Sequence, residues 1–385
     1  MKRKELQVVM GLCIVLGLRM LGVFMILPVL SSYGLFLEYS SKFLVGLAIG
    51  IYGLAQLLFQ IPFGFFSDKI GRKSVILFGL ILFFLGSFIT SISHSIWGLI
   101  VGRALQGSGA ISATCMAYVS DLVEETHYAK VMVLIGMTYG LTFALSVVIG
   151  PMIISIFNFH ALFWITFILS FLAILITYFF IPNIYLSSYN VDICSFKNSM
   201  LSIIKNHDLI KLYFGIFTLH VLLMFNFIFF PIQLEFLKFS LENHWKLYLI
   251  VMFISFISII LVFLYSKTKL WIRAILLTSN IFLILSEIIF FNSLSSFYSF
   301  LLGIQIFFIA FNILESLIPS LVGKKSCIQY KGTAMGTYST AQFLGIACGG
   351  IIGGWIFSVF NILGLIISGL IISILWLLVS YSIRN

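Results

Sequence analysis

The chain has 385 residues, of which 61% are hydrophobic and only 9% are charged. A soluble domain carries about a quarter charged residues and cannot bury so much apolar surface, so the composition excludes an ordinary soluble protein. The net charge of +10 would suit a nucleic-acid partner, but the basic residues lie between apolar runs on one side of the predicted topology, which argues against one.

Apolar runs of about 20 residues recur along the whole chain, and each is long enough to cross a bilayer as a helix. They lack the alternation of barrel strands, so we predict an all-α polytopic membrane protein with twelve transmembrane helices. The first run follows the basic residues 2–4 but contains Arg19 and is too long for a signal peptide, so we interpret it as a retained span. The predicted spans cover residues 7–36, 43–66, 74–92, 96–121, 130–157, 160–181, 209–236, 245–265, 271–291, 297–322, 333–358 and 361–381.

Lysine and arginine residues cluster on one side of this topology. Both termini lie on that side with seventeen of the 22 basic residues, whereas the other side carries only Lys42, Lys238 and Lys246. Loops rich in lysine and arginine stay in the cytoplasm. We therefore expect a multi-pass protein of the bacterial cytoplasmic (inner) membrane with both termini in the cytoplasm.

The longest polar interval lies near the midpoint and separates the predicted spans into two sets of six. We predict an N-terminal half, residues 1–182, and a C-terminal half, residues 209–385, joined by a cytoplasmic linker, residues 183–208. Apolar residues at every third or fourth position of the linker indicate a helix lying on the membrane surface. The stretch "KVMVLIGMTYG" at 130–140 resembles "KGTAMGTYSTA" at 331–341, which is typical of the related halves of secondary transporters.

The loop between the second and third predicted spans, "GFFSDKIGRK" at residues 64–73, concentrates charge. A basic cytoplasmic loop with a glycine turn explains its lysines, but it requires neither Asp68 nor this spacing. Arg72 can pair with Asp68 and with Asp121, which lies at the cytoplasmic end of the fourth predicted span. The positive N-terminus of the eleventh span can attract Asp68. Charges that can separate and pair again suit a conformational switch.

This loop fits the signature G-x-x-x-D-[RK]-x-G-R-[RK] of the major facilitator superfamily. The matching residues are Gly64, Asp68, Lys69, Gly71, Arg72 and Lys73. The resemblance implies a fold of two six-helix halves, with these residues and Asp121 forming a latch between the halves in the outward-open state. Gly64 would permit close helix approach, and Gly71 would permit the tight reversal between the spans.

Further stretches extend this resemblance across the membrane region. "GRALQGSGA" at 102–110 is similar to the fourth-span signature of proton-coupled members. "LRMLGVFMILPVL", "GIYGLAQLLFQIPFG" and "YKGTAMGTYSTAQFLG" closely resemble members from enteric bacteria whose proposed activity is proton-driven efflux. Gly150 and Pro151 match the fifth-span antiporter motif, but Ser146 stands where that motif has a glycine. The resemblance implies proton-coupled export, and the departure at Ser146 leaves drug antiport open.

Four ionisable residues lie well inside predicted spans: Arg19, Arg103, His220 and Glu315. Such a group near the bilayer centre costs about 2.5–3.5 kcal/mol on insertion scales, so it normally faces a cavity or a partner. Because burial disfavours the charged form of a carboxyl group, we predict Glu315 as the residue that exchanges a proton, with His220 and Arg103 as further coupling residues. The structural alternatives are packing charges held by backbone carbonyls and hydrogen bonds between helices. Glu287 lies nearer the outer surface and is a weaker candidate.

Polar side chains within the apolar spans predict the lining of a solute cavity: Arg19, Gln56, Gln106, Asn226, Gln305, Asn312 and Gln342. A mostly apolar cavity with a few polar groups suits an amphipathic or lipophilic solute. The chain has no phosphate-binding loop signature, no nucleophile motif and no metal-ligand spacing among its five cysteines. We therefore expect neither enzymatic activity nor a cofactor or metal.

The favoured interpretation is a monomeric secondary transporter that exports small molecules against inward proton flow. Its expected partners are a small-molecule solute, protons and the lipid bilayer, and not nucleic acid. Uptake or facilitated diffusion of a metabolite is the alternative, because motifs shared across the superfamily do not set direction. A membrane scaffold that has lost transport is a third possibility, and the intact residues Asp68, Arg72 and Asp121 argue against it.

Overall fold

The chain folds almost entirely into long apolar α-helices. A computed structural model describes residues 3–123, 125–183, 206–265, 269–326 and 331–383. Within that part, ten helical segments are long and apolar enough to cross a membrane. The same residues contain no β-strand beyond one isolated bridge between Glu38 and Ser95. The expected all-α polytopic membrane fold is therefore confirmed.

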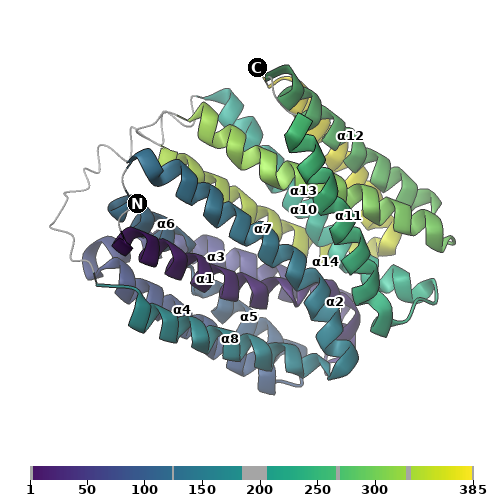
Figure 1. Cartoon of the computed structure of the whole chain (residues 1–385). Coiled ribbons are helices and arrows are strands. Elements are labelled where there is room, and N and C mark those ends of the chain that lie inside the picture. The colour runs from purple at the N-terminus through teal and green to yellow at the C-terminus, as the bar shows by residue number, and fades with distance from the viewer. Residues whose placement is uncertain (1–2, 124, 184–205, 266–268, 327–330, 384–385) are drawn as a thin grey trace.

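The helices begin and end where the local sequence provides caps and turns. Ser41, Ser95 and Asn158 each accept a hydrogen bond from the backbone N–H three residues later, so they start α3, α5 and α8. In chain order (Figure 1) the helices are α1 (Arg3–Phe24), α2 (Leu27–Tyr33), α3 (Lys42–Ile70), α4 (Arg72–Ile92), α5 (Ile96–Ser108), α6 (Ser112–Leu122), α7 (Glu125–Ile156), α8 (Phe159–Phe180), α10 (His207–Phe236), α11 (His244–Tyr265), α12 (Lys269–Asn292), α13 (Phe297–Lys325) and α14 (Lys331–Tyr381), with short 3-10 turns at Gly34–Phe36 and Leu241–Asn243.

The count of ten spans differs from the expected twelve, first because the predicted span 96–121 is divided. It forms α5, with 13 residues, and α6, with 11, and each is shorter than a bilayer crossing requires. The break lies at Gly109, where an added Cβ would stand 2.2 Å from the backbone oxygen of Gly79 in α4. Only a glycine permits this approach, so close packing against α4 accompanies the break.

The second difference is one of counting, because the predicted spans 333–358 and 361–381 are two helices that meet at a kink within the segment labelled α14. A straight helix of its 51 residues would be about 77 Å long, more than twice the thickness of a bilayer core. The chain departs from helical geometry inside α14 at Asn361, which has φ 55° and ψ −155°. Lys42 donates a hydrogen bond to the Asn361 side chain at 2.7 Å and so ties this bend to the start of α3.

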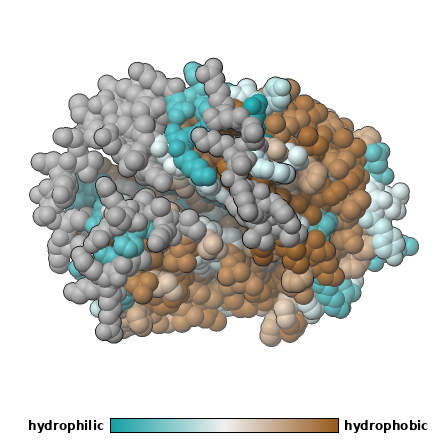
Figure 2. Space-filling model, turned by 45° about the horizontal axis from the view of Figure 1, so that its top comes forward, coloured by the Kyte–Doolittle hydropathy of each residue, from teal (hydrophilic) through white to brown (hydrophobic). Residues whose placement is uncertain are grey.

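Large apolar side chains cover much of the outer surface. Figure 2 shows a broad hydrophobic surface, with hydrophilic residues gathered beside the grey residues and at the opposite edge of the view. Phe78, Ile257 and Ile371 are examples of large apolar side chains that are exposed. Such an extensive apolar surface would be unfavourable in water, and a lipid environment accommodates it.

The helices α1 to α8 and α10 to α14 lie in two neighbouring groups in Figure 1. They meet most closely where α3 crosses α14, because an added Cβ at Gly50 would stand 2.6 Å from the backbone oxygen of Ala347. Ser31 of α2 also donates to the backbone oxygen of Phe227 in α10 at 2.8 Å. Both contacts lie away from the end of the bundle that carries the two chain termini, here called the terminal end. The surface helix predicted in the linker lies mostly outside the described residues.

Candidate functional site

Arg72 lies at the centre of the charged loop at the terminal end. It begins α4 directly after α3 ends, and its guanidinium forms an ion pair with Asp68 one helical turn earlier. The same side chain donates from Nε to Asp121 Oδ2 of α6 at 2.8 Å and from Nη1 to Ser67 Oγ at 2.6 Å. The structure therefore brings Asp68, Arg72 and Asp121 together, as the pairing argument expected.

The two glycines of the loop behave differently. Gly71 has φ +99°, in the region that other residues rarely adopt, and this conformation makes the reversal from α3 to α4. An added Cβ at Gly64, by contrast, would meet no atom within 4 Å. The close helix approach expected at Gly64 is absent from this structure, because that face of α3 has no neighbouring helix against it.

The two lysines of the loop contact aromatic residues of the first helix group. Lys69 Nζ lies 4.4 Å from the centre of the Phe65 ring, one turn earlier on α3. Lys73 Nζ donates to the backbone oxygen of Tyr178 in α8 at 2.8 Å. These contacts hold the loop within its own helix group rather than across to α14.

Asp68 itself is partly exposed, with 37% of its side chain accessible. Among the described residues its ion pair is with Arg72, and α14 supplies no partner to it. An added Cβ at Gly336, near the start of α14, would meet no atom within 4 Å, just as at Gly64 of α3. The two helices are thus in backbone contact at the opposite end and lack such contact near the latch residues.

Arg19 of α1 is completely buried inside the first helix group. Its Nη2 donates to Gln56 Oε1 of α3 at 2.6 Å, and its Cζ lies 5.5 Å from the centre of the Phe83 ring in α4. An aromatic face at this distance attracts a cation. Arg19 is therefore stabilised by an amide and a ring rather than by an acid.

Arg103 of α5 is also completely buried. Its Nη1 donates to Gln106 Oε1 at 3.1 Å, and the Gln106 amide donates in turn to Ser87 Oγ of α4 at 3.0 Å. Its Cζ lies 4.7 Å from the centre of the Tyr52 ring in α3. Arg103 and Arg19 thus lie against the same two helices, α3 and α4.

Arg19, Gln56 and Gln106, which were predicted to line a solute cavity, are all completely buried in this structure. Each amide faces a guanidinium or a hydroxyl inside the helix group, so these polar side chains bind one another. Helical phase in the sequence separates polar from apolar faces, but it does not separate the interior of a bundle from a cavity wall.

His220, Gln342 and Glu315 form a second cluster, at the meeting point of α10, α14 and α13. Gln342 Nε2 lies 2.9 Å from His220 Nε2 and 3.2 Å from Glu315 Oε1. His220 Nε2 and Glu315 Oε2 are 3.9 Å apart, and His220 Nδ1 lies 3.1 Å from the backbone oxygen of Ile216. Three residues that were predicted separately, two for coupling and one for the cavity, are therefore direct neighbours.

The remaining predicted cavity residues are held by other helices of the second group. Gln305 donates to Ser255 Oγ of α11 at 3.2 Å, and the Asn312 amide lies 3.9 Å from Met252 Sδ. Asn226 of α10 donates to a carboxylate oxygen of α12 at 3.5 Å. The structure does not bring these three residues into the cluster around Gln342.

The carboxylate beside Asn226 belongs to Glu287, which the sequence placed nearer the outer face of the membrane than the other ionisable residues. It is only 3% exposed, and an added Cβ at Gly369 of α14 would stand 3.0 Å from its carboxyl carbon. Leu283 and Phe290, one turn to either side on α12, are completely buried. Large apolar residues such as Leu285 and Ile288 also lie on the exposed face of α12, so the sequence carried no signal that Glu287 points inward.

A further ion pair at the terminal end was not predicted. Lys325 Nζ of α13 donates to Asp208 Oδ2 of α10 at 2.7 Å, and Lys211 Nζ lies 3.8 Å from Asp208 Oδ1. The sequence places these residues at the same membrane face. It does not say which helix ends are neighbours, so the pairing had no sequence signal.

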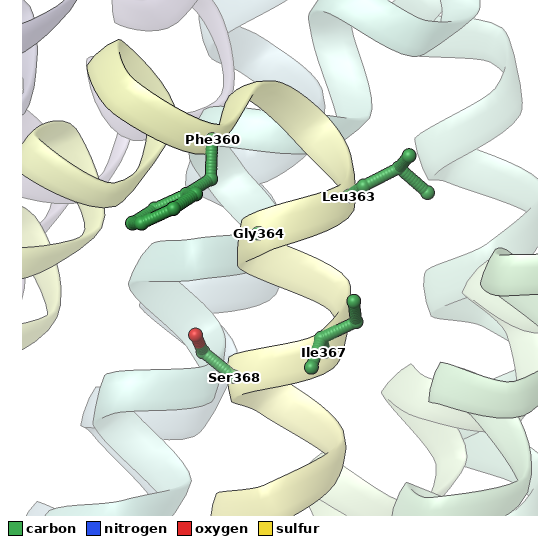
Figure 3. A pocket seen from close by; sticks show the side chains of 5 residues that line it. All are labelled: Phe360, Leu363, Gly364, Ile367 and Ser368. Carbon is green, nitrogen blue, oxygen red and sulfur yellow. The ribbon is translucent and has the colours of Figure 1, made fainter.

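Two grooves open on the outside of the second helix group, and neither contains a predicted site residue. One, of about 310 Å³, is lined by consecutive turns of α14 from Phe360 to Ser368. Figure 3 shows Phe360 and Ser368 on one side of the helix, and Leu363 and Ile367 on the other, with Gly364 between them. The other, of about 300 Å³, is lined mainly by apolar residues of α10 and α14. Both belong to the apolar outer surface rather than to the polar clusters.

Comparison with known proteins agrees with this geometry. Residues 12–344 match the family model of the Major Facilitator Superfamily. The inner membrane transport protein YajR of Escherichia coli (strain K12) is 45% identical over 375 residues, which cover 97% of this chain and 83% of that protein. An uncharacterised transporter of Buchnera aphidicola subsp. Baizongia pistaciae is 41% identical over 387 residues, covering 98% of this chain and 97% of that protein.

The fold is also found among solved structures. The nucleoside transporter NupG superposes with a TM-score of 0.74 over 98% of this chain and 100% of its own, at 14% identity, so this likeness concerns the fold alone. The family match and the identity to transport proteins over nearly the whole chain confirm the resemblance inferred from the loop signature. The chain is a multi-pass inner-membrane transport protein that belongs to the major facilitator superfamily.

Proposed function

We propose that the chain exports small amphipathic or lipophilic molecules in exchange for inward-moving protons, by alternating access between two six-helix halves. The cluster of His220, Gln342 and Glu315 carries this proposal, because it joins two titratable groups through one amide on three separate helices. The bias of basic residues toward one side supports cytoplasmic termini. We take the monomer as the working unit.

The hydrogen bonds of the cluster define one protonation state. Because a backbone carbonyl only accepts, the ring nitrogen Nδ1 of His220 beside Ile216 carries the proton. Nε2 of the neutral ring then accepts from the Gln342 amide, whose second N–H donates to Glu315. Gln342 therefore favours a neutral histidine beside an ionised carboxylate.

A proton that reaches the cluster would break this pattern. A proton on His220 Nε2 would make that nitrogen a donor facing the N–H donor of Gln342. The Gln342 amide would then have to rotate, and its N–H group would no longer donate to Glu315. A proton on Glu315 would convert an acceptor into a donor and weaken the same bond. Either event changes the hydrogen bonds that the Gln342 side chain makes to α10 and α13. The amide therefore links proton binding to the position of α14.

The helix that carries Gln342 also forms the contact between the helix groups. Gly350, about two turns after Gln342 on α14, would place an added Cβ 2.4 Å from the backbone nitrogen of Gly50 in α3. A shift of α14 therefore acts directly on a backbone-to-backbone contact that has no side chains to absorb it. This supports proton-linked movement of α14 against α3.

We assign the loop residues Gly64, Asp68, Lys69, Gly71, Arg72 and Lys73, with Asp121, to a latch that closes the terminal end. Arg72 is already fixed by Asp121 and Ser67. Asp68, partly exposed, is the member available to the positive N-terminus of α14 when the helices approach. The open faces at Gly64 and Gly336 support an assignment of this structure to the state in which the latch is released.

The test is transport by the purified full chain in proteoliposomes with an imposed pH gradient and a panel of labelled amphipathic, lipophilic and polar solutes. Export coupled to protons predicts that one solute class accumulates against its gradient only while the pH gradient lasts. Discharge of the gradient with a proton–potassium exchanger should stop accumulation without stopping exchange. Equilibration of the solute without accumulation would instead indicate facilitated diffusion. Accumulation of the solute in the compartment that the protons enter would indicate uptake by symport.

A further inference from the structure

The first helix group buries two positive charges without an acid beside them. Arg19 and Arg103 are both completely buried. None of the carboxylates in the described part of the chain forms an ion pair with either guanidinium. Glu5, the acid on the same helix as Arg19, lies about 20 Å away along α1 at about 1.5 Å per residue.

Several donors in this cluster have no hydrogen-bond partner within the described structure. They are Arg19 Nε and Nη1, Arg103 Nη2 and Gln56 Nε2. The acceptors already present, Gln56 Oε1, Gln106 Oε1 and the backbone oxygen of Ala48, are each used by one guanidinium. What the cluster needs is therefore an acceptor, and the charges on its donors favour an acceptor that is negative.

The two guanidiniums have their partners on neighbouring turns of the same two helices, α3 and α4. Arg19 binds Gln56 and Arg103 covers Tyr52, and these two residues are one turn apart on the same face of α3. Arg19 covers Phe83, and the Gln106 amide beside Arg103 binds Ser87, one turn later on α4. Neighbouring positions on one helix face are about 5–6 Å apart, so an ion between the two side chains can approach both.

The aromatic rings offset part of the charge, but they provide no hydrogen-bond acceptor in the plane of the guanidinium. Arg103 Cζ lies 4.7 Å from the centre of the Tyr52 ring, and the Tyr52 hydroxyl makes no hydrogen bond within the described structure. An unpaired buried charge is unfavourable even when rings surround it. Close packing with no exposure also restricts the size of any ligand to a few atoms.

We propose that Arg19 and Arg103 together bind one small monovalent anion, of halide or formate size, inside the first helix group. The anion accepts the unused guanidinium N–H groups and the Gln56 amide. One bound monovalent anion leaves the two guanidiniums with a net charge of one, and the rings of Tyr52 and Phe83 lie against this remaining charge. This site is separate from His220 and Glu315 and does not depend on the proposed direction of transport or on proton coupling.

The test is the thermal unfolding midpoint of the purified full chain in detergent, at fixed sodium concentration and ionic strength. Bulky gluconate is replaced stepwise by chloride in one series and by formate in another. Because an ion that binds only the folded state stabilises it, the midpoint should rise with the logarithm of the small-anion concentration. A rise in both series indicates a halide-sized site, and a rise with formate alone assigns the site to a carboxylate.

Arg19→Gln and Arg103→Gln should each lose this dependence, whereas Lys324→Gln, which removes an exposed charge, should keep it. Equal midpoints of the parent in all three salts would overturn the proposal, as would an undiminished rise in Arg19→Gln. If the arginine variants do not fold, crystals of the parent grown in bromide decide the matter. An anomalous peak within hydrogen-bond distance of Arg19 and Arg103 supports the site, and bromide bound only elsewhere refutes it.

Discussion

The side-chain amide of Gln342 lies 2.9 Å from Nε2 of His220 and donates to it when that nitrogen is unprotonated. The same amide nitrogen lies 3.2 Å from Glu315 Oε1, so a single group contacts both candidate proton carriers. A residue in this position does not itself exchange a proton. It sets how easily its two neighbours do so.

Gln342→Leu should therefore shift the pH dependence of transport. The substitution removes the amide that contacts both candidate proton carriers, so each loses a hydrogen bond that depends on its protonation. With about 1.4 kcal/mol for one such bond, the midpoint of the flux-against-pH curve should move by about one unit. Gln233→Leu removes a buried amide that binds a backbone oxygen outside the cluster, and it should keep the parent's midpoint. A midpoint unmoved in Gln342→Leu would leave Gln342 with a packing role.

Asp68→Asn should favour the state in which the terminal end is open. The substitution removes the charge that can meet the N-terminus of α14, while Arg72 keeps its hydrogen bonds to Asp121 and Ser67. Spin labels at Phe179→Cys and Lys324→Cys, in a background without native cysteines, report the separation of α8 and α13 at this end. Long distances should become more populated, and Glu38→Gln, at the opposite end, should leave the distribution as in the parent. Impaired transport with an unchanged distribution would point to folding or insertion instead of a switch.

Arg103→Ala should reach the membrane normally and lose proton-coupled flux. The Arg103 guanidinium donates to Gln106, and the Gln106 amide donates to Ser87 of α4. The substitution therefore disrupts linked, buried polar contacts without opening the helix ends. Membrane content by immunoblot and flux under a fixed pH gradient are measured together, with Lys246→Ala, an exposed basic residue, as the matched control. Coupling equal to that of the parent would remove Arg103 from the mechanism. Loss of the protein from the membrane would assign it to folding.

The sequence predicted the positions of most apolar helices because each apolar run is long enough to cross a bilayer and nearly free of charge. It also separated two spans near Asn361, where α14 has its kink, but it did not predict the break at Gly109. That break accompanies a contact with another helix, namely the backbone of Gly79 in α4. Local sequence does not contain such contacts.

The candidate sites show the same division. Asp68 and Arg72 are one turn apart across a glycine, so their pairing follows from spacing alone. His220, Glu315 and Gln342 lie on three helices, and only the rotation of each helix brings them together. The sequence does not give the rotation of each helix about its axis. For this reason Gln56 was assigned to a cavity, whereas in the structure it is bound to Arg19. Residue type identified the participants, and tertiary packing decided their partners.

Glu315→Gln should abolish accumulation driven by a pH gradient while solute exchange survives. One charge crossing about 100 mV releases about 2.3 kcal/mol, and each pH unit adds about 1.4 kcal/mol. Since about 1.4 kcal/mol corresponds to a tenfold ratio, one proton can sustain a solute ratio of tens to hundreds, provided that a residue binds it on one side and releases it on the other. Glutamine resembles the protonated carboxyl and cannot release a proton.

The measurement compares accumulation and exchange of the same labelled solute in the same vesicles, so that a folding defect lowers both and a coupling defect lowers only accumulation. Glu38→Gln, which changes an exposed acid between α2 and α3, serves as the matched control and should accumulate like the parent. Glu287→Gln distinguishes the two buried carboxyls, because Glu287 binds Asn226 and has no contact with Gln342 in the described structure. If Glu315→Gln accumulates solute fully and Glu287→Gln does not, the coupling proton belongs to Glu287. The cluster around Gln342 would then be structural.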